Sequence, residues 1–322
     1  MKIFSSRAVS VAALTFVATV AFATIPAFAD GVSRPGEMVQ LIAGKSFAAS
    51  NVEAGPVPSV VRRAANIKVT YTGFSKAAKK AFQRAVDIWA TRIDSSVTIN
   101  IDASFKDLGN IDILGQAGPT GFYRDFKGAP KPNIFYPVAL ANKLAGKQLD
   151  TDPEILAEFN SQFSNWHFEK SPAPLGKYDF TTVVLHELGH GLGFIGAADA
   201  DADIATIRID TPPFPDIYSN FVENGSGKSI LTFADPSAAL RNQLVSKNLF
   251  FDSKKVRKKN NGNPAKIFAP KTFVLGTSYS HLDEKTFGQG NPNSLMTPLL
   301  GDGETIRDPG AITLAIFDSI GW

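Results

Sequence analysis

The sequence predicts an α+β fold, and three observations support this fold class. Residues 67–71 and 97–101 alternate apolar and polar side chains, as half-buried strands do, and they enclose a stretch with helical spacing at 74–93. Two further helical stretches, 180–192 and 311–320, follow later in the chain. Of the 322 residues, 44% are hydrophobic and 20% are charged, so the chain can bury a sizeable core and is not disordered.

The first 29 residues have the layout of a secretory signal peptide. Lys2 and Arg7 form a short basic start, an apolar run covers 8–22, and residues 27–29 (AFA) are a small-x-small cleavage signal. An uncleaved membrane anchor is the alternative, and Pro26 favours cleavage over it. We therefore expect a secreted protein, extracellular or in the cell envelope, with no stable membrane insertion after cleavage.

Charge and cysteine usage exclude several classes of function. Without residues 1–29 the chain carries 31 basic and 30 acidic residues, so a nucleic-acid partner is not expected. The absence of cysteine excludes thiol catalysis and thiolate metal sites. We expect a monomer whose chemistry depends on other side chains.

The chain before the second helix divides into an arm and a sheet-forming region. Residues 30–65 are expected to form an N-terminal arm or a short pro-segment, and Arg62-Arg63 precedes the first predicted strand. The strand–helix–strand order over 67–101, with Ser75 as helix N-cap, predicts neighbouring parallel strands. Further strand-like runs lie at 133–138 and 154–160, and Gly/Pro-rich loops are expected at 115–121 and 127–132. Together these elements predict an N-terminal mixed, twisted sheet with two helices.

The chain changes character after Gly193. Residues 199–280 are expected to be a long insert with one helix around 236–248 and a solvated, charged loop at 254–263. Residues 281–322 then contain turns and close with an apolar helix over 311–320. The expected C-terminal subdomain is built from this section.

The helical stretch 180–192 carries a zinc-binding pattern, His186-Glu187-Leu188-Gly189-His190. Histidines at i and i+4 lie on one face of a helix, so both imidazoles can bind the same metal ion. Glu187 is offset by one residue and can reach a metal-bound water as general base. These residues predict one catalytic Zn²⁺ site.

A catalytic zinc site needs a third protein ligand, and the residues alone leave several candidates. The compact extended motif places a glycine and then a histidine after the second ligand; Gly193 fits, but position 196 is glycine. The remaining candidates are His281, Glu223, His167 and the group Asp199, Asp201 and Asp203.

The motifs resemble those of metzincin zinc peptidases, and most of all the leishmanolysin-type branch. His186, Glu187, His190 and Gly193 match the first motif of that branch, whereas Ser280-His281 and Leu295-Met296-Thr297 match its distant third histidine and methionine turn. The resemblance implies a catalytic domain over 66–322, with 199–280 as the insert and His281 as the third ligand. Two features depart from the branch: this chain has no cysteine, and no tyrosine follows the methionine turn.

The resemblance implies a secreted zinc-dependent endopeptidase that acts on protein or peptide substrates. The substrate of such enzymes lies extended along an edge strand, for which 133–138 and 154–160 are the candidates here. Two alternative functions are a secreted binding or adhesion protein without turnover, and a zinc amidase acting on cell-wall peptides. The alternating aspartates at 199–203 lack the pattern of an EF-hand, so a looser Ca²⁺ site and a solvated turn are the two interpretations there.

Overall fold

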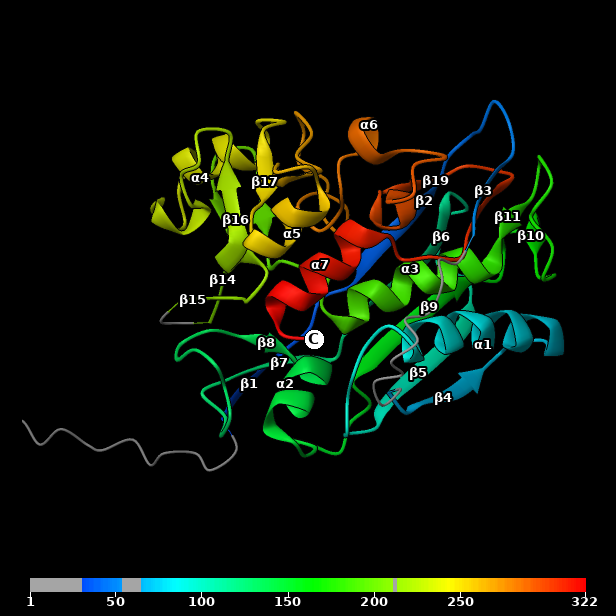
Figure 1. The fold of residues 1–322 in the computed structure, drawn as a ribbon, viewed down its shortest axis with the longest axis horizontal. Coiled ribbons are helices and arrows are strands. Elements are labelled where there is room, and N and C mark those ends of the chain that lie inside the picture. The colour runs from blue at the N-terminus through cyan, green and yellow to red at the C-terminus, as the bar shows by residue number, and fades with distance from the viewer. Residues whose placement is uncertain (1–30, 54–64, 211–212) are drawn as a thin grey trace, which may run out of the picture.

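The computed structural model describes residues 31–53, 65–210 and 213–322 (Figure 1). Helix and strand occur in nearly equal shares, 26% and 27%, which confirms the predicted α+β class. The predicted signal peptide over 1–29 and the Arg62-Arg63 pair lie outside the described residues.

The main sheet is mixed and has six strands in the order β19-β2-β6-β9-β5-β4. Strands β4, β5 and β9 are parallel to one another, whereas β6 runs antiparallel to both β9 and β2. In sheet order the strands are Leu299–Leu300, Val39–Ala43, Ile113–Pro119, Ile155–Asn160, Ile99–Lys106 and Ile67–Thr72. The edges of the sheet are therefore β19 and β4.

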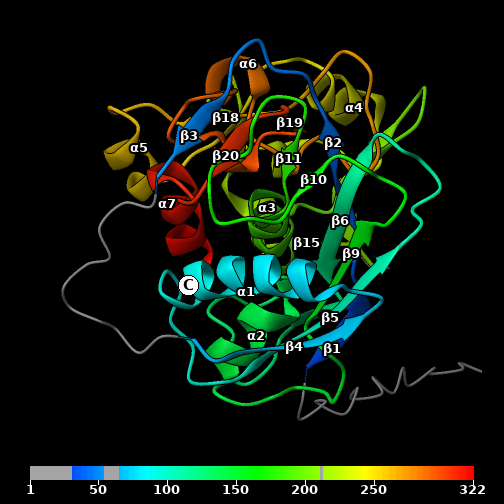
Figure 2. The same cartoon turned by 90° about the vertical axis from the view of Figure 1, so that its right-hand side faces the viewer.

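Helices α1 (Lys76–Ala90) and α3 (Phe180–Leu192) pack on one face of this sheet (Figure 2). Along β4 and β5, better-covered and more exposed residues alternate, as expected when only one face of a sheet is covered. Every residue of α3 is buried, because α1, the sheet strands β6, β9 and β2, and the 294–296 turn pack around it; helix α7 (Ala311–Ile320) contacts α1 through Phe317 and Trp89. The sequence-predicted helices at 180–192 and 311–320 are confirmed with the same boundaries.

The remaining elements are short and surround this core. The helices are α2 (Val138–Ala145), α4 (Ala238–Leu244), α5 (Lys254–Lys259) and α6 (Glu284–Phe287), with 3-10 turns at Ser219–Phe221, Ile230–Thr232 and Ser294–Met296. The small sheets contain β1 (Val32–Pro35), β3 (Ser50–Val52), β7 (Gly121–Arg124), β8 (Tyr136–Pro137), β10 (Trp166–His167), β11 (Tyr178–Asp179), β12 (Asp199–Ala200), β13 (Ala205–Thr206), β14 (Arg208–Ile209), β15 (Phe214–Pro215), β16 (Val222–Asn224), β17 (Leu249–Phe251), β18 (Ala265–Ile267) and β20 (Glu304–Ile306).

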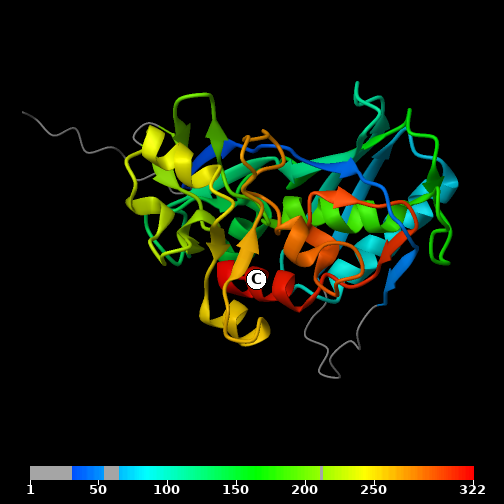
Figure 3. The same cartoon turned by 90° about the horizontal axis from the view of Figure 1, so that it is seen from above.

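The first described segment, 31–53, is paired with the rest of the molecule along most of its length. Strand β1 pairs with β7, β2 enters the main sheet, and β3 pairs with β20. Seen from above, this segment runs in blue alongside α3 (Figure 3). Part of the expected N-terminal arm is therefore integrated into the sheets.

The prediction of a loop at 115–121 is wrong, because β6 and β7 occupy this stretch. The glycines that suggested a loop permit close approach of neighbouring chains instead. A Cβ at Gly118 would lie 1.7 Å from the Glu37 carbonyl oxygen, and one at Gly115 would lie 3.2 Å from the Glu187 side chain.

Three other expectations are corrected. Residues 254–259 form α5, capped by the Ser253 side chain and anchored by buried Val256, instead of a charged loop. The helix expected around 236–248 is limited to α4. Neither candidate edge strand lies at an edge of the main sheet: β9 is internal, and β8 belongs to a three-stranded sheet.

No helix in the described ranges is long and apolar enough to cross a membrane.

Candidate metal centre

The N-terminus of helix α3 is held by an N-cap hydrogen bond and a buried ion pair. The Asp179 side chain accepts a hydrogen bond from the Thr182 backbone amide at 2.6 Å and is paired by both terminal nitrogens of Arg307. Asp179 is fully buried, so its carboxylate is compensated by these donors and by the positive end of the helix. These contacts fix the start of the helix that carries His186 and His190.

The helix ends at Gly193, as the motif predicts. Gly193 has φ of +121°, a conformation that L residues with a side chain rarely adopt, and its amide bonds back to the last turn. The chain then turns so that the Phe194 carbonyl faces His190. Gly196 packs against an aromatic ring: a Cβ there would lie 2.3 Å from Tyr279.

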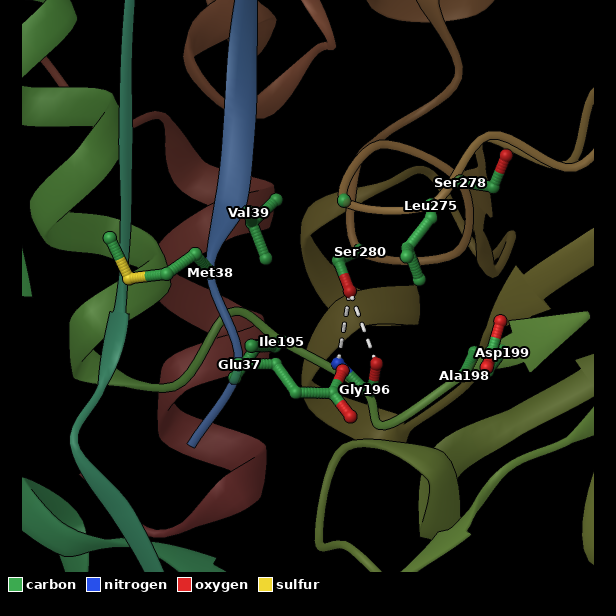
Figure 4. Close-up of a pocket in the computed structure, with 11 residues that line it drawn as sticks. Glu37, Met38, Val39, Ile195, Gly196, Ala198, Asp199, Leu275, Ser278 and Ser280 are labelled. Atoms are coloured by element: carbon green, nitrogen blue, oxygen red, sulfur yellow. Dashed lines mark hydrogen bonds between the residues drawn. The ribbon is translucent and has the colours of Figure 1, made fainter. Parts of the chain in front are cut away.

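A separate loop brings His281 to the helix. Ser280 is held against the turn after α3, since its hydroxyl accepts from the Gly196 amide and donates to the Gly196 carbonyl (Figure 4). The Leu282 amide donates to the Met296 carbonyl at 2.7 Å, which ties this loop to the 294–296 turn. His281 is thereby fixed from both sides, 91 residues after His190.

Buried Asp216 supports the same loop from behind. Its carboxylate accepts hydrogen bonds from the Ala197 amide and from both the amide and the hydroxyl of Ser219, which in turn accepts from the Tyr279 hydroxyl at 2.9 Å. Burial raises the pKa of Asp216, and these donors oppose the rise. The network joins the turn after α3 to the residue two positions before His281.

The structure brings His186, His190 and His281 together in one buried group. Their Nε2 atoms are 2.9 Å apart for the first pair and 3.2 Å apart for each of the other two. All three side chains are at most 1% exposed. Among the described residues these histidines form the one group of three or more potential ligands whose donor atoms lie within 4.8 Å of one another. The group could hold a metal ion.

Each of these imidazoles has its other nitrogen, Nδ1, beside a main-chain carbonyl. The acceptors are Leu295 for His186 at 2.6 Å, Phe194 for His190 at 2.8 Å and Thr277 for His281 at 2.7 Å. Because a carbonyl oxygen only accepts, each Nδ1 carries the proton and each Nε2 is left with a free lone pair. Burial lowers the pKa of all three histidines, that of His186 to about 4, so the neutral, ligating form is favoured.

Met296 lies directly beneath the helix motif. A Cβ at Gly189, between the two helix histidines, would lie 2.8 Å from the Met296 sulfur. Met296 is fully buried, and the carbonyl of its neighbour Leu295 orients His186. The 294–296 turn therefore supports the histidine group both by packing and by a hydrogen bond.

Glu187 is buried without a hydrogen-bond partner among the described residues. It is 0% exposed, and both of its carboxyl oxygens are unpaired. Burial raises its pKa well above the usual value, an effect that the nearby backbone groups of Leu41 and Ala117 only partly offset. A buried, unpaired carboxyl group of this kind is a candidate for proton transfer.

The other candidate ligands lie elsewhere. None belongs to the histidine group. Asp199 is exposed, and the Asp201 carboxylate caps a turn through the amides of Asp203 and Ile204. Glu223 is in β16 and lies 3.7 Å from Arg257.

His167, the fourth histidine, hydrogen-bonds the Ser171 carbonyl outside the group. The three aspartates at 199–203 are likewise not part of any group of three potential ligands in the described part of the chain.

The sequence analysis did not identify Leu41 and Gly115 as neighbours of Glu187. Leu41 lies opposite Gly115 in the β2–β6 pair, and both border Glu187. An isolated glycine in a strand often marks close approach of another group, and the Gly115 to Gly118 spacing was the available signal.

Comparisons of this chain with known protein families, with curated proteins and with solved structures find no match.

Proposed function

We propose that this chain is a secreted zinc-dependent endopeptidase, with His186, His190 and His281 as metal ligands and Glu187 as general base. The observation that carries the proposal is the three Nε2 lone pairs, turned toward one another by Nδ1 hydrogen bonds, with a buried, unpaired carboxyl group next to the first ligand in the chain.

The donor set fits zinc. Three neutral imidazoles are a common ligand set of catalytic zinc, and tetrahedral Zn–N bonds place the nitrogens about 3.3 Å apart. The observed separations of 2.9 to 3.2 Å are close to this value. Without a cation between them, three facing lone pairs would repel one another, so the arrangement favours an ion at their centre.

When bound, a zinc ion supplies a Lewis acid that makes water nucleophilic near neutral pH and stabilises negative charge on a carbonyl oxygen. Glu187 accepts a proton from the attacking water and delivers it to the leaving amine. Burial raises the pKa of Glu187 and so strengthens it as a base, whereas the charge of a bound cation would oppose this rise and favour the ionised form that accepts the proton.

The leishmanolysin-type branch of metzincins remains the family that we propose for this chain. The late third histidine and Met296 beneath Gly189 support it. The chain has no cysteine, so its 199–280 insert is held by a hydrophobic core and by polar networks such as that of Asp216.

Metal content and hydrolysis of casein test the proposal. The samples are the native protein, His281→Ala and, as matched control, His167→Ala, which removes the histidine outside the group. Because segment 31–53 is built into the sheets beside the centre, hydrolysis is assayed both before and after this segment is cut from the rest of the chain. The cut is made at a site-specific protease sequence introduced between residues 53 and 65. We expect one zinc per chain in the native protein and the control, with hydrolysis by at least the cleaved form of each, and loss of both zinc and hydrolysis in His281→Ala.

Full zinc content in His281→Ala would refute the three-histidine site. Bound zinc without hydrolysis in either form of the native protein would favour the binding or adhesion protein instead. Hydrolysis of cell-wall peptides but not of casein would favour the amidase.

A further inference from the structure

The candidate centre is closed to solvent, and the N-terminal segment lies against it. Glu187 and the three histidines are at most 1% exposed, although a hydrolase must admit a substrate carbonyl to these groups. The backbone of Leu41 in β2 lies near the Glu187 carboxyl group, and Gly115, the partner of Leu41 in β6, borders the same side chain. Leu41 is itself 1% exposed.

Strand β2 is held by its main chain on both sides. On one side Val39 pairs with Ala117 and Leu41 with Gly115 in the antiparallel ladder with β6. On the other side three β2-region amides donate to carbonyls of the C-terminal part: Gln40 to Gly276 at 2.7 Å, Ile42 to Pro298 at 3.2 Å and Gly44 to Leu300 at 2.7 Å. Bonding of this kind does not depend on side-chain identity, and it is how an added peptide strand binds to a sheet edge.

The inward side chains of β2 fill apolar pockets at alternate positions. Val39 packs with Phe122, Phe135 and Ile195 in a small buried cluster, and Leu41 belongs to the main core. Between them Gln40 points away, toward Gln116 on the outer face. We call the space that β2 occupies, between β6 and the 276–300 segment, the channel. Its shape suits an extended chain with aliphatic residues two positions apart and a polar residue between them.

The channel continues past the start of β2 as an open cavity. This cavity, of about 340 Å³, is lined by residues 37–39, by the turn after α3 and by residues of the 275–280 loop (Figure 4). It lies beside Ser280, next to the third histidine, so a longer peptide has room beyond the length of β2.

We propose that the channel between β6 and the 276–300 segment binds an extended peptide substrate, and that β2 is its internal occupant. Residues 31–53 therefore keep the centre latent until they leave. This inference rests on the proposed function, whose substrate class it names: extended peptides with aliphatic residues at two alternate positions.

Covalent attachment of the segment explains why latency would persist. Strands β1 and β3 hold it at either end of β2, and the chain from Glu53 to Ala65 connects it to the rest. A tethered strand rebinds at a high effective concentration, whereas a cut one can diffuse away.

The test uses the full chain with a site-specific protease sequence introduced between residues 53 and 65. Three samples are compared: uncut, cut, and cut with a Gln40→Cys/Gln116→Cys disulfide, which locks β2 onto β6. Binding of a fluorescent peptide with the sequence of residues 36–45 is measured by anisotropy in the Glu187→Gln background, and its hydrolysis is measured with Glu187 present.

We expect cutting to tighten peptide binding by more than about tenfold, and the disulfide to abolish this gain until it is reduced. A Thr70→Cys/Asp102→Cys disulfide between β4 and β5, at the far edge of the sheet, is the matched control and should leave the gain unchanged.

A second variant tests the uncut chain. Gln40→Pro removes the amide that donates to Gly276 and should raise peptide binding about fivefold, the equivalent of one lost hydrogen bond. Gln40→Ala keeps that amide and should not.

Equal binding by cut and locked samples, or no gain from either cutting or Gln40→Pro, overturns the inference. Binding that follows release of β2 without hydrolysis in any sample supports the channel, and in that case it is the endopeptidase proposal that fails.

Discussion

The orientation of each clustered imidazole is set by a main-chain carbonyl and not by a side chain. Backbone acceptors at Leu295, Phe194 and Thr277 cannot be removed by substitution, so the protonation pattern of the three histidines is a property of the fold. Local changes in chain path at these three turns would reorient a ligand without altering any ligand residue.

Glu187→Gln should separate metal binding from catalysis. The amide keeps the size of the side chain but cannot accept the proton, so we expect unchanged zinc content and a loss of hydrolysis of about 10²- to 10⁴-fold. Zinc content and the rate of peptide hydrolysis are measured together. Glu223→Gln, a partly buried carboxyl group outside the centre, is the control and should lose neither; comparable hydrolysis by Glu187→Gln would show that another group acts as base.

Three of the four site residues could be predicted from spacing alone. His186, Glu187 and His190 lie within one turn and a half of a single helix, where sequence separation fixes proximity. His281 could not be chosen in this way, because its position depends on the path of some 90 residues; the residues alone left it as one of several candidates, and only the resemblance singled it out. The roles of Leu41 and Gly115 depend on strand pairing, which local sequence does not specify.

At the scale of elements, α3 depends on its buried N-cap. Asp179→Ala would leave Arg307 without its partner and free the first helical amides, so we expect a fall of about 3–5 kcal/mol in the free energy of unfolding. Ser75→Ala removes the more exposed N-cap of α1 and should cost about 1 kcal/mol. Urea unfolding at a fixed zinc concentration measures the loss in free energy of unfolding for each variant. Equal losses for Asp179→Ala and Ser75→Ala would mean that the Asp179–Arg307 ion pair adds no stability beyond the N-cap hydrogen bond.

Elements with a strong periodic pattern were predictable, whereas those defined by partners were not. The helices at 180–192 and 311–320 have long apolar patterns, and the structure gives them the same boundaries. Strand β6 contains Gly115, Gly118 and Pro119, a composition typical of a loop, yet pairing with both β2 and β9 makes it a strand. Helix α5 is highly charged, and it is held by the Ser253 cap, by buried Val256 and by packing against the 311–320 helix.

For the molecule as a whole, buried Glu304 makes stability depend on pH. Burial, with a contribution from nearby Glu284, raises the pKa of Glu304 from 4.5 to about 7, against a hydrogen bond from the Gly301 amide. Between pH 4.5 and about pH 7 the folded state binds more protons than the unfolded state. The contribution of Glu304 to the free energy of unfolding therefore falls as pH rises through this range and is lowest above pH 7.

Glu304→Gln should remove this dependence. The amide oxygen can still accept from Gly301 but carries no charge, so we expect the variant to exceed the native protein in stability by a margin that grows from pH 5 to pH 8, to at most about 3 kcal/mol. Denaturant unfolding at several pH values measures the margin. Glu53→Gln, at an exposed carboxyl group, is the control; a margin that shrinks with rising pH would contradict the assignment.

The α+β class could be predicted from the sequence, but the way in which the parts combine could not. Pairing of β3 with β20 and of β2 with β19 joins residues more than 240 positions apart, and no local pattern encodes such partners. Segment 31–53 is the clearest case, since its composition indicated an arm while its pairing places it inside the sheets.

The wide separation of the three histidines also has a consequence for synthesis. A chain still emerging from the ribosome contains His186 and His190 long before His281 and the 294–296 turn exist, and Trp322, later still, donates to the Leu192 carbonyl at the end of α3. A nascent or truncated chain therefore offers only two ligands. On the proposed function, the centre would therefore form only after His281 has been synthesised, when most of its own chain has had the chance to fold.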